Sequence, residues 1–261
     1  MAGALTFRLI GHGVAYSASP AMMAAAFEAL GLPHRYVLAD VPAEGLGPVV
    51  ASLRMADAGG ANVTVPHKAV LARAMDALSS TAREADAVNT VVREGHRLIG
   101  HNTDMPATVE ALERLCPAGV HHAVVLGAGG VSRAVQLALA KLGTARVTIL
   151  RRSDGSMAGL ADALASADLL VNATPVGTGS DESLVPAGLL RPDLAVLDLV
   201  YRPSPTRLVR DAHAAGARAE SGAAILLGQA WRSLDLWLDR AAPVAVMREA
   251  LETELGGSIG G

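Results

Sequence analysis

The sequence predicts an α/β protein with two domains, and three observations support this fold class. First, 51% of the 261 residues are hydrophobic but only 3% are aromatic, which is typical of Ala-, Val- and Leu-rich helices layered on a parallel sheet. Second, short apolar runs alternate with helical patterns along the chain, which predicts parallel strands joined by helices. Third, the apolar run Val124–Leu126 leads into a glycine cluster and then an Ala-rich helical pattern, as in the first βα turn of a Rossmann-like fold.

Residues 1 to about 76 are expected to alternate strand and helix three times, giving a mainly parallel sheet with covered faces. Pro20 suits the first turn of a helix, with Ser19 as its N-cap and Gly31 at its end. A hairpin is expected to turn at Glu94-Gly95. The expected strands are 6–10, 35–39, 61–65, 87–93 and 97–100, and the expected helices are 20–31, 43–53, a segment opened by Pro66, and 105–115.

A domain boundary is expected at Pro117-Ala118-Gly119, because proline and glycine interrupt the helical pattern before it. The second domain continues the alternation of strands and helices. Two helical patterns follow it, and periodicity does not say which domain they pack on. The expected strands are 123–126, 146–150, 168–172 and 194–199, and the expected helices are 131–142, 157–164, 206–215, 223–238 and 244–255.

The glycine cluster matches a dinucleotide fingerprint whose third position is the small residue Ser132. Gly127 and Gly129 can adopt backbone angles closed to other residues, and they let a pyrophosphate approach the main chain. The N–H groups of the turn and the helix dipole then face the negative charge. The segment Gly127-Ala128-Gly129-Gly130-Val131 is therefore a candidate cofactor-binding turn; the alternative is a glycine-rich turn that binds nothing.

Two arginines stand where an NAD-binding fold usually places an acidic residue, about 20 residues after the glycines. Arg151 and Arg152, followed by Ser153, come at the end of the second strand of this domain. The planar fork of a guanidinium fits a 2′-phosphate, so the expected cofactor is NADP rather than NAD. The alternative is two exposed loop arginines, and Asp154 could cap the next helix.

Polar residues also follow the predicted third strand. Asn62 and Thr64 share one side of an extended segment, and we expect them to face a cleft at the carboxyl end of the sheet. Val63 and Val65 share the other side and are expected to face the core. Lys68 then falls in the first helical turn, where the positive end of the helix dipole makes a cation unfavourable. A lysine in this position is better suited to proton transfer. A solvated surface lysine is the alternative.

Four further polar residues are candidates for a ligand site. Asp104 either caps the following helix or pairs its carboxylate with Lys68, and the two interpretations are compatible. Ser17 and Ser19 lie at a helix N-terminus, which suits a carboxylate, although capping by Ser19 alone is the simpler interpretation. Asn89 lies near a strand start, and the alternative is a loop asparagine that bonds its own backbone.

Composition and spacing argue against several functions. The net charge is −3 without a run of Lys or Arg, which argues against a nucleic-acid partner. No uninterrupted apolar stretch approaches the ~18 residues of a membrane span. No histidine has metal-ligand spacing, so no metal is expected. Cys116 is the only cysteine, which favours a cytoplasmic location.

These motifs occur together in one known family, and the chain resembles shikimate dehydrogenase over nearly its whole length. Each matching stretch is short, but their order and spacing together are highly specific. The matching stretches are Ser17–Pro20, Asn62–Lys68, Ala87–Thr90, Gly100–Asp104, Gly127–Gly130, Asn172–Pro175, Asp198–Pro203 with Thr206, and Gly222 with Leu226 and Gln229-Ala230.

The resemblance implies a function, the NADPH-dependent reversible reduction of 3-dehydroshikimate to shikimate in aromatic amino acid biosynthesis. It implies that Lys68 is the acid/base, with Asp104 beside it. It also implies that Ser17 and Ser19 hold the substrate carboxylate. Further substrate contacts are implied for Thr64, Asn89, Asp104, Tyr201 and Gln229, and cofactor contacts for Gly127, Ala128, Gly129, Gly130, Val131, Arg151, Arg152, Ser153, Thr174, Leu199 and Gly222.

The resemblance also implies a domain plan. Residues 1–117 would bind the small-molecule substrate, 118–221 would form a Rossmann-like NADP-binding domain, and the helices of 222–261 would pack on the first domain. An NAD-dependent quinate/shikimate dehydrogenase and a non-catalytic sensor of NADPH and a hydroaromatic acid are the alternative functions, and a homodimer stays open. Met23, Asp86, Ala107 and Thr178 depart from the family pattern, and Leu199 replaces a common Met.

Overall fold

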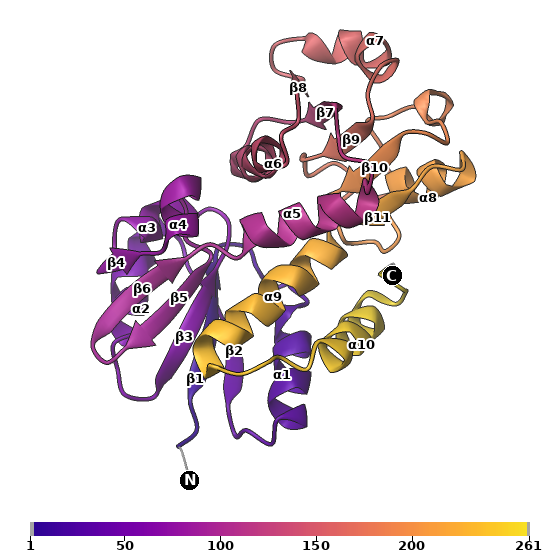
Figure 1. Ribbon diagram of the computed structural model, residues 1–261. Helices are drawn as coiled ribbons and strands as arrows, with labels where there is room; N and C mark the ends of the chain where they lie inside the picture. Colours follow the sequence, from indigo (N-terminus) through magenta and orange to yellow (C-terminus); the bar gives the residue numbers. More distant parts are fainter. Residues whose placement is uncertain (1–2, 260–261) are drawn as a thin grey trace. The chain divides into compact units, whose positions relative to one another are not determined.

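The computed structural model describes residues 3–259 (Figure 1). The chain divides into two compact units, which we describe separately. Unit 1 comprises Met1–Asp104 and Leu227–Glu254, and unit 2 comprises Met105–Leu226 and Leu255–Gly261. The helix that begins at Asp104 groups with unit 2 from its second residue on, whereas the sequence predicts it in the first domain. The functional domain plan remains a prediction.

Unit 1 contains a six-stranded mixed sheet in the order β2-β1-β3-β5-β6-β4. The first three strands pair in parallel, as the alternation of strands and helices predicts. β5 and β6 form the predicted hairpin, and β5 is also antiparallel to β3. β6 therefore runs in the direction of β3, and both strands end at one edge of the sheet. The strands are β1 (Thr6–Gly11), β2 (Arg35–Asp40), β3 (Ala58–Val63), β4 (Ala77–Leu78), β5 (Thr90–Glu94) and β6 (Arg97–His101).

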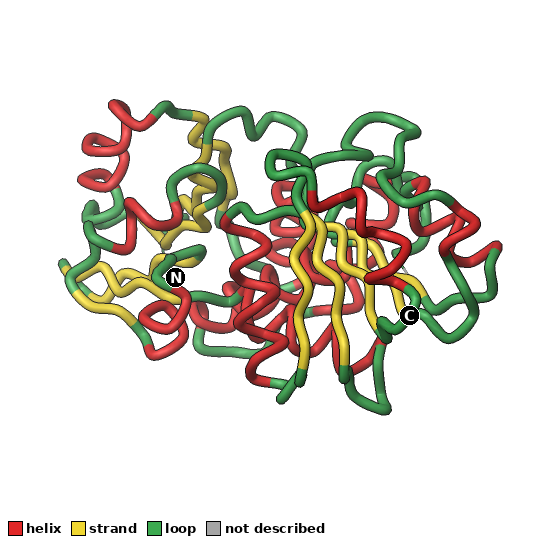
Figure 2. Tube along the Cα trace, turned by 90° about the horizontal axis from the view of Figure 1, so that it is seen from above, coloured by secondary structure: helices red, strands yellow, loops and turns green. Residues whose placement is uncertain are grey.

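Helices cover both faces of this sheet (Figures 1 and 2). The Phe7 ring of β1 lies 5.1 Å from Phe27 of α1 and 4.7 Å from Trp237 of α9. On the other face, Ile10 joins a buried cluster with Leu71 of α3 and residues of α2. The helices are α1 (Ser19–Ala29), α2 (Leu46–Ser52), α3 (Lys68–Ala72), α4 (Ser80–Ala85), α9 (Ala223–Leu238) and α10 (Val244–Leu255), with a 3-10 turn at Ala43–Gly45.

The third strand lies earlier in the chain than predicted. β3 ends at Val63, and the prediction that Val65 faces the core is wrong, because its side chain is 57% exposed. Gly59 belongs to the strand although it carries no strand signal. A Cβ atom added there would lie 2.3 Å from the ring of Phe7, so the glycine makes room for the aromatic side chain. A pattern of β-branched residues does not predict a glycine at such a strand position.

Two helix starts also differ from the predictions. α1 begins at Ser19, with Ala18 at the N-cap position, so the expected capping by Ser19 is wrong. The Ser17 hydroxyl oxygen instead accepts a hydrogen bond from the Ser19 N–H at 3.2 Å. The helix expected to open at Pro66 begins at Lys68. β4 and α4 are too short for a periodic pattern to predict them.

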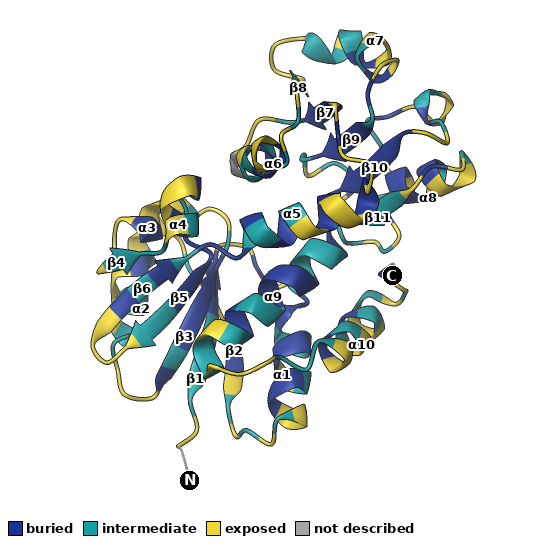
Figure 3. Cartoon of the chain, viewed as in Figure 1, coloured by how far each residue is buried: buried dark blue, intermediate teal, exposed yellow. Residues whose placement is uncertain are grey.

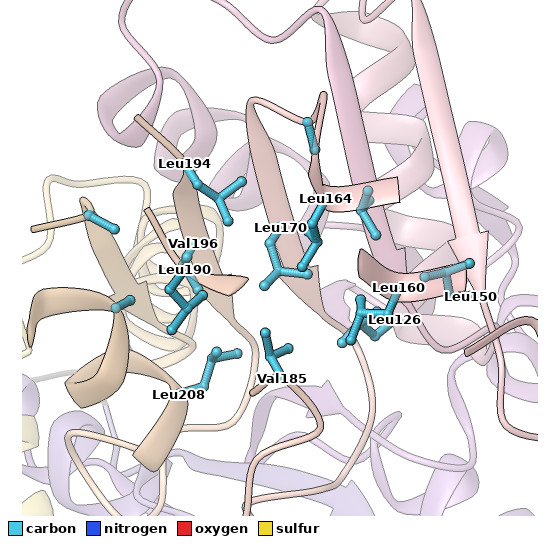
Figure 4. Close-up of a cluster of buried hydrophobic side chains, with 14 residues drawn as sticks. Leu126, Leu150, Leu160, Leu164, Leu170, Val185, Leu190, Leu194, Val196 and Leu208 are labelled. Carbon is cyan, nitrogen blue, oxygen red and sulfur yellow. The ribbon is translucent and has the colours of Figure 1, made fainter. Parts of the chain in front are cut away.

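Unit 2 contains a five-stranded parallel sheet in the order β11-β10-β9-β7-β8. Alternate residues of β7 enter two cores: Val124 and Leu126 join the cluster shown in Figure 4, and Val125 joins a second cluster with Leu139 of α6. The predicted Rossmann-like alternation is thus present. The strands are β7 (His122–Leu126), β8 (Arg146–Leu150), β9 (Leu169–Asn172), β10 (Ala195–Asp198) and β11 (Ala219–Ser221), and the helices are α5 (Asp104–Leu115), α6 (Gly130–Lys141), α7 (Leu160–Leu164) and α8 (Arg207–Ala214), with 3-10 turns at Ser156–Gly159 and Ala187–Leu189.

Burial follows this layered arrangement. The inner strands β7, β9 and β10 of unit 2 are buried along their whole length, whereas the helices expose their outer faces (Figure 3). Within residues 3–259, no helix is both long and apolar enough to cross a bilayer.

Candidate active site

The predicted lysine and aspartate form an ion pair in unit 1. Lys68 Nζ lies 2.8 Å from Asp104 Oδ2, and the two side chains are 29% and 19% exposed. Lys68 begins α3, which follows β3, and Asp104 begins α5, which follows β6. Because β3 and β6 run in the same direction, their carboxyl ends meet at one edge of the sheet, where open α/β sheets bind ligands. The topology therefore joins two residues that are 36 positions apart.

This pair can move a proton at a partly exposed position. The Lys68 ammonium can donate a proton and take one up again. The neighbouring Asp104 carboxylate stabilises the ammonium charge and orients the ammonium group. Asp104 is the first residue of α5 and therefore does not occupy the N-cap position, which precedes the helix. Of the two interpretations of Asp104, the structure shows the pairing with Lys68. The catalytic role of both residues remains a prediction.

Asn62 does not face a cleft, contrary to the prediction. Its side chain is 4% exposed and enters a buried polar cluster. Asn62 Oδ1 accepts a hydrogen bond from Tyr36 Oη at 2.8 Å, and Asn62 Nδ2 donates to Ser233 Oγ at 2.8 Å. Thr64, just past the end of β3, is partly exposed and could reach a ligand. The prediction failed because both partners of Asn62 are distant in sequence.

Asn89 and Gln229, two predicted substrate contacts, also lie in unit 1 and are 2% and 8% exposed. Asn89 Nδ2 donates to Thr103 Oγ1 at 2.9 Å, so a substrate contact would use the other N–H of that amide. Thr103 Oγ1 in turn donates to the main-chain oxygen of Gln229 at 3.1 Å. Neither Thr103 nor Ser233 is among the site residues predicted from the sequence. A signal exists for Ser233, which lies one helical turn after Gln229 in a mostly apolar helix.

The two serines before α1 occupy different surroundings. Ser17 is partly exposed, whereas Ser19 is 4% exposed. Burial raises the pKa of Tyr36, and a hydrogen bond with the Ser19 side chain opposes that shift. Ser19 is thus tied to the hydroxyl that also bonds Asn62. Ser17 is the more accessible of the two for the predicted carboxylate contact.

In unit 2, the glycine cluster forms a tight turn between β7 and α6. Gly127 has a φ of +98°, and a Cβ atom there would lie 3.0 Å from the main-chain oxygen of Ala173. Ser132 is fully buried and closes the turn by donating from Oγ to the Gly127 oxygen at 2.8 Å. Gly129 occupies the N-cap of α6, and no side chain caps this helix. Ala128, Gly129 and Val131 are exposed or partly exposed, so the first turn of α6 is open to an anion.

The segment after β8 exposes Arg151, Arg152 and Ser153. Arg151 Nε lies 3.9 Å from Asp154 Oδ2, and its main-chain N–H donates to Ser156 Oγ at 2.7 Å. Asp154 accepts the Ser156 N–H at 3.0 Å, and hydrogen bonding from Ser156 lowers the pKa of this carboxyl. The aspartate is therefore engaged at the start of a 3-10 turn. Within residues 3–259, the Arg152 side chain has no hydrogen-bond or ion-pair partner and is free for an anionic ligand.

A second polar cluster lies where β9 and β10 end. Asn172 Nδ2 donates to Asp198 Oδ1 at 2.8 Å, and Thr174 Oγ1 donates to Asn172 Oδ1 at 2.7 Å. Thr206 Oγ1 donates to Asp198 Oδ2 at 2.7 Å. Asp198 is 1% exposed, and burial raises the pKa of its carboxyl despite these hydrogen bonds. The cluster fixes the loop that carries Thr174, a predicted cofactor contact.

Leu199, Tyr201 and Gly222 follow in the same unit. Leu199 and Tyr201 are partly exposed, and Gly222 is buried. A Cβ atom on Gly222 would lie 2.2 Å from the Leu199 oxygen. The glycine is thus required by the close approach of two backbone segments, whether or not a nicotinamide lies nearby.

Family models match both ends of the chain. Residues 9–91 match the shikimate dehydrogenase substrate binding domain, and residues 222–252 match the shikimate 5′-dehydrogenase C-terminal domain. A protein of Dehalococcoides mccartyi strain CBDB1 named shikimate dehydrogenase (NADP(+)) is 38% identical, over 95% of this chain and 96% of its own. The chain belongs to the shikimate dehydrogenase family. A relative of the same name from Pyrococcus abyssi is also 38% identical, over 96% of this chain and 98% of its own.

Solved structures of the family share the fold. Shikimate 5-dehydrogenase from Thermus thermophilus, in complex with NADP(H) and shikimate, superimposes with a TM-score of 0.85 at 38% identity, covering 96% of this chain and 100% of its own. Quinate dehydrogenase from Corynebacterium glutamicum, in complex with NAD, gives a TM-score of 0.88 at 28% identity, with 96% and 99% covered. The predicted family and α/β fold class are confirmed. Since both enzymes share the fold, substrate and cofactor must be argued from residues.

Proposed function

We propose that the protein catalyses the NADPH-dependent, reversible reduction of 3-dehydroshikimate to shikimate. The observation that carries this proposal is the ion pair of Lys68 Nζ and Asp104 Oδ2, 2.8 Å apart at the carboxyl ends of β3 and β6. It supplies a proton donor and an orienting carboxylate in a chain of the shikimate dehydrogenase family. The reaction and cofactor expected from the sequence agree with the names of the relatives.

Each predicted site residue has a defined task in the proposed reaction. Lys68 Nζ donates a proton to the oxygen that forms when the 3-keto group is reduced, and it accepts that proton in the reverse direction. The ammonium also stabilises the negative charge developing on this oxygen. Asp104 holds the ammonium and orients the substrate hydroxyl. Ser17 and Ser19 would bind the carboxylate, and Thr64, Asn89, Tyr201 and Gln229 the remaining substrate groups.

Unit 2 has the features that NADP requires. When bound, the cofactor supplies a hydride or takes one up at its nicotinamide ring. The turn Gly127–Val131 would hold the pyrophosphate, because the first turn of α6 lacks a side-chain cap. Arg151, Arg152 and Ser153 would hold the 2′-phosphate. Thr174, Leu199 and Gly222 would line the nicotinamide pocket.

We further propose a domain plan and a location. Residues 1–117 with the helices of 222–261 would bind substrate, and 118–221 would bind NADP. The grouping of Leu227–Glu254 with unit 1 supports the return of the last helices. A cytoplasmic location is supported by the single cysteine, Cys116. A homodimer remains a matter for measurement.

A second candidate, an NAD-dependent quinate or shikimate dehydrogenase, is favoured by the TM-score of 0.88 with the NAD-bound quinate dehydrogenase. The charge after β8 argues against it. Two exposed arginines stand there, and the nearby carboxylate of Asp154 is engaged with Ser156. An NAD site needs such a carboxylate for the ribose 2′-hydroxyl.

The deciding experiment measures turnover by the absorbance of NADPH or NADH with four pairs: shikimate or quinate, each with NADP or NAD. Shikimate with NADP is expected to give the highest kcat/KM. Faster turnover of quinate with NAD would support the second candidate. Shikimate binding without any turnover at enzyme excess would support a non-catalytic sensor and overturn the proposal.

A further inference from the structure

We propose that Thr103 and Ser233 are positioning residues that fix Asp104 and Gln229 relative to each other. The inference rests on the proposed function, because it concerns the same site in unit 1. Neither hydroxyl belongs to the predicted set of site residues. Thr103 is 4% exposed and Ser233 is fully buried, and both hydroxyls donate hydrogen bonds within the protein.

The first link is a two-point contact between Asn89 and Thr103. Asn89 Oδ1 accepts the Thr103 N–H at 2.7 Å, and Asn89 Nδ2 donates to Thr103 Oγ1 at 2.9 Å. One planar amide thus restrains both the main chain and the side chain of Thr103. Thr103 is bonded covalently to Asp104, the first residue of α5. The contact therefore sets the direction in which the Asp104 carboxylate leaves the backbone.

The second link connects Thr103 to helix α9. Thr103 Oγ1 donates to the main-chain oxygen of Gln229 at 3.1 Å, and Ser233 Oγ donates to the same oxygen at 2.9 Å. Two hydroxyls thus converge on one carbonyl. A serine that bonds the carbonyl four residues earlier can bend a helix locally. The contact fixes the rotation of α9 at the residue whose side chain would reach the substrate.

The third link ties Ser233 to the sheet. Asn62 Nδ2 of β3 donates to Ser233 Oγ at 2.8 Å, and Ser233 Oγ lies 2.8 Å from Thr90 Oγ1 of β5. Residues 62 and 233 are 171 positions apart. The cluster thereby joins two strands, the start of α5 and α9 in one hydrogen-bonded unit.

An apolar cluster could pack the same helix without specifying its rotation. Buried hydroxyls and amides are costly unless every member is satisfied, so a satisfied network admits few alternative arrangements. The site needs this restriction, because a substrate bound by Asp104 and Gln229 must meet both side chains at once. Small misplacement of such groups has a large effect on turnover.

The test compares three variants of the full-length protein. Thr103→Val removes the hydroxyl while keeping the shape, and Thr103→Ser retains the hydroxyl. Thr108→Val is the matched control, because Thr108 is 3% exposed and lies about one turn further along α5. For each variant, kcat, KM for shikimate, KM for NADP and the unfolding temperature are measured.

Thr103→Val is expected to raise KM for shikimate and to lower kcat, each by about tenfold, as loss of an orienting hydrogen bond does. KM for NADP should stay unchanged, and Thr103→Ser should restore turnover. Unchanged shikimate kinetics in a folded Thr103→Val, or equal losses in Thr108→Val, would overturn the positioning role while leaving the proposed function intact. If Thr103→Val does not fold, Ser233→Ala is held to the same criteria. A wild type without shikimate turnover would overturn both proposals.

Discussion

Replacing Arg152 by Ala tests the assignment of the 2′-phosphate site. Arg152 follows β8, is exposed, and its side chain has no partner within residues 3–259. A charge-assisted hydrogen bond contributes about 1.5–3 kcal/mol, and we take the lower end because the site is exposed. About 1.5 kcal/mol corresponds to roughly a tenfold rise in KM for NADP. KM for NAD should change little, because NAD carries no 2′-phosphate.

The assay is steady-state oxidation of shikimate, followed by the absorbance of NADPH or NADH at varied cofactor concentration. Arg151→Ala is the matched control, because the Arg151 side chain already lies 3.9 Å from the Asp154 carboxylate. We expect it to raise KM for NADP less than Arg152→Ala does. Arg152 does not bind the 2′-phosphate if Arg152→Ala leaves the NADP/NAD preference unchanged, or if it raises both KM values equally.

Two further predictions concern stability. Gly222→Ala should lower the free energy of unfolding by about 3 kcal/mol, because the added Cβ atom would lie 2.2 Å from the Leu199 oxygen. Gly159→Ala is the control, because a Cβ atom there would have nothing within 4 Å. Equal urea midpoints of the two variants would contradict the prediction. Burial lowers the pKa of His34 below 6.5, and its Nδ1 accepts the Leu5 N–H. On acidification, His34 of the unfolded chain therefore binds a proton at a higher pH than His34 of the folded chain. The free energy of unfolding should fall as the pH drops below about 6.5. His34→Asn should weaken this slope, and an unaltered slope would refute the assignment.

The parts of the fold predicted best from sequence have strong local periodicity. The last two helices, 223–238 and 244–255, begin and end at the predicted residues. The βα turn at Gly127 also forms as predicted, because its glycines, its preceding strand and its following helix are neighbours in sequence. Local backbone preference and one amphipathic face are sufficient to specify such elements.

The parts that could not be predicted depend on distant partners. The sequence predicts that Asn62 faces a cleft, yet Ser233, which lies 171 positions later, accepts its hydrogen bond in the core. Gly59 lies outside the predicted strand 61–65, yet it belongs to β3 and accommodates the ring of Phe7. Neither partner has a local signature, so only the assembled sheet and helices reveal the role of these residues.

The candidate site is an intermediate case. The sequence allows two interpretations of Asp104, a helix cap and a partner of Lys68. Sequence spacing does not decide between them, because 36 residues separate the two side chains. β3 and β6 run in the same direction, so the starts of α3 and α5 lie at one edge of the sheet. This arrangement allows Asp104 to pair with Lys68.

The kcat of Lys68→Met with shikimate and NADP tests the central claim most directly. The ion pair is partly exposed, so its loss should lower the free energy of unfolding by only about 1 kcal/mol. Loss of the proton donor should lower kcat by about 100-fold or more. The control is Lys141→Met, at the exposed end of α6, which should retain the wild-type kcat. A Lys68→Met protein that is folded and turns over shikimate within a few-fold of the wild-type rate would contradict the account.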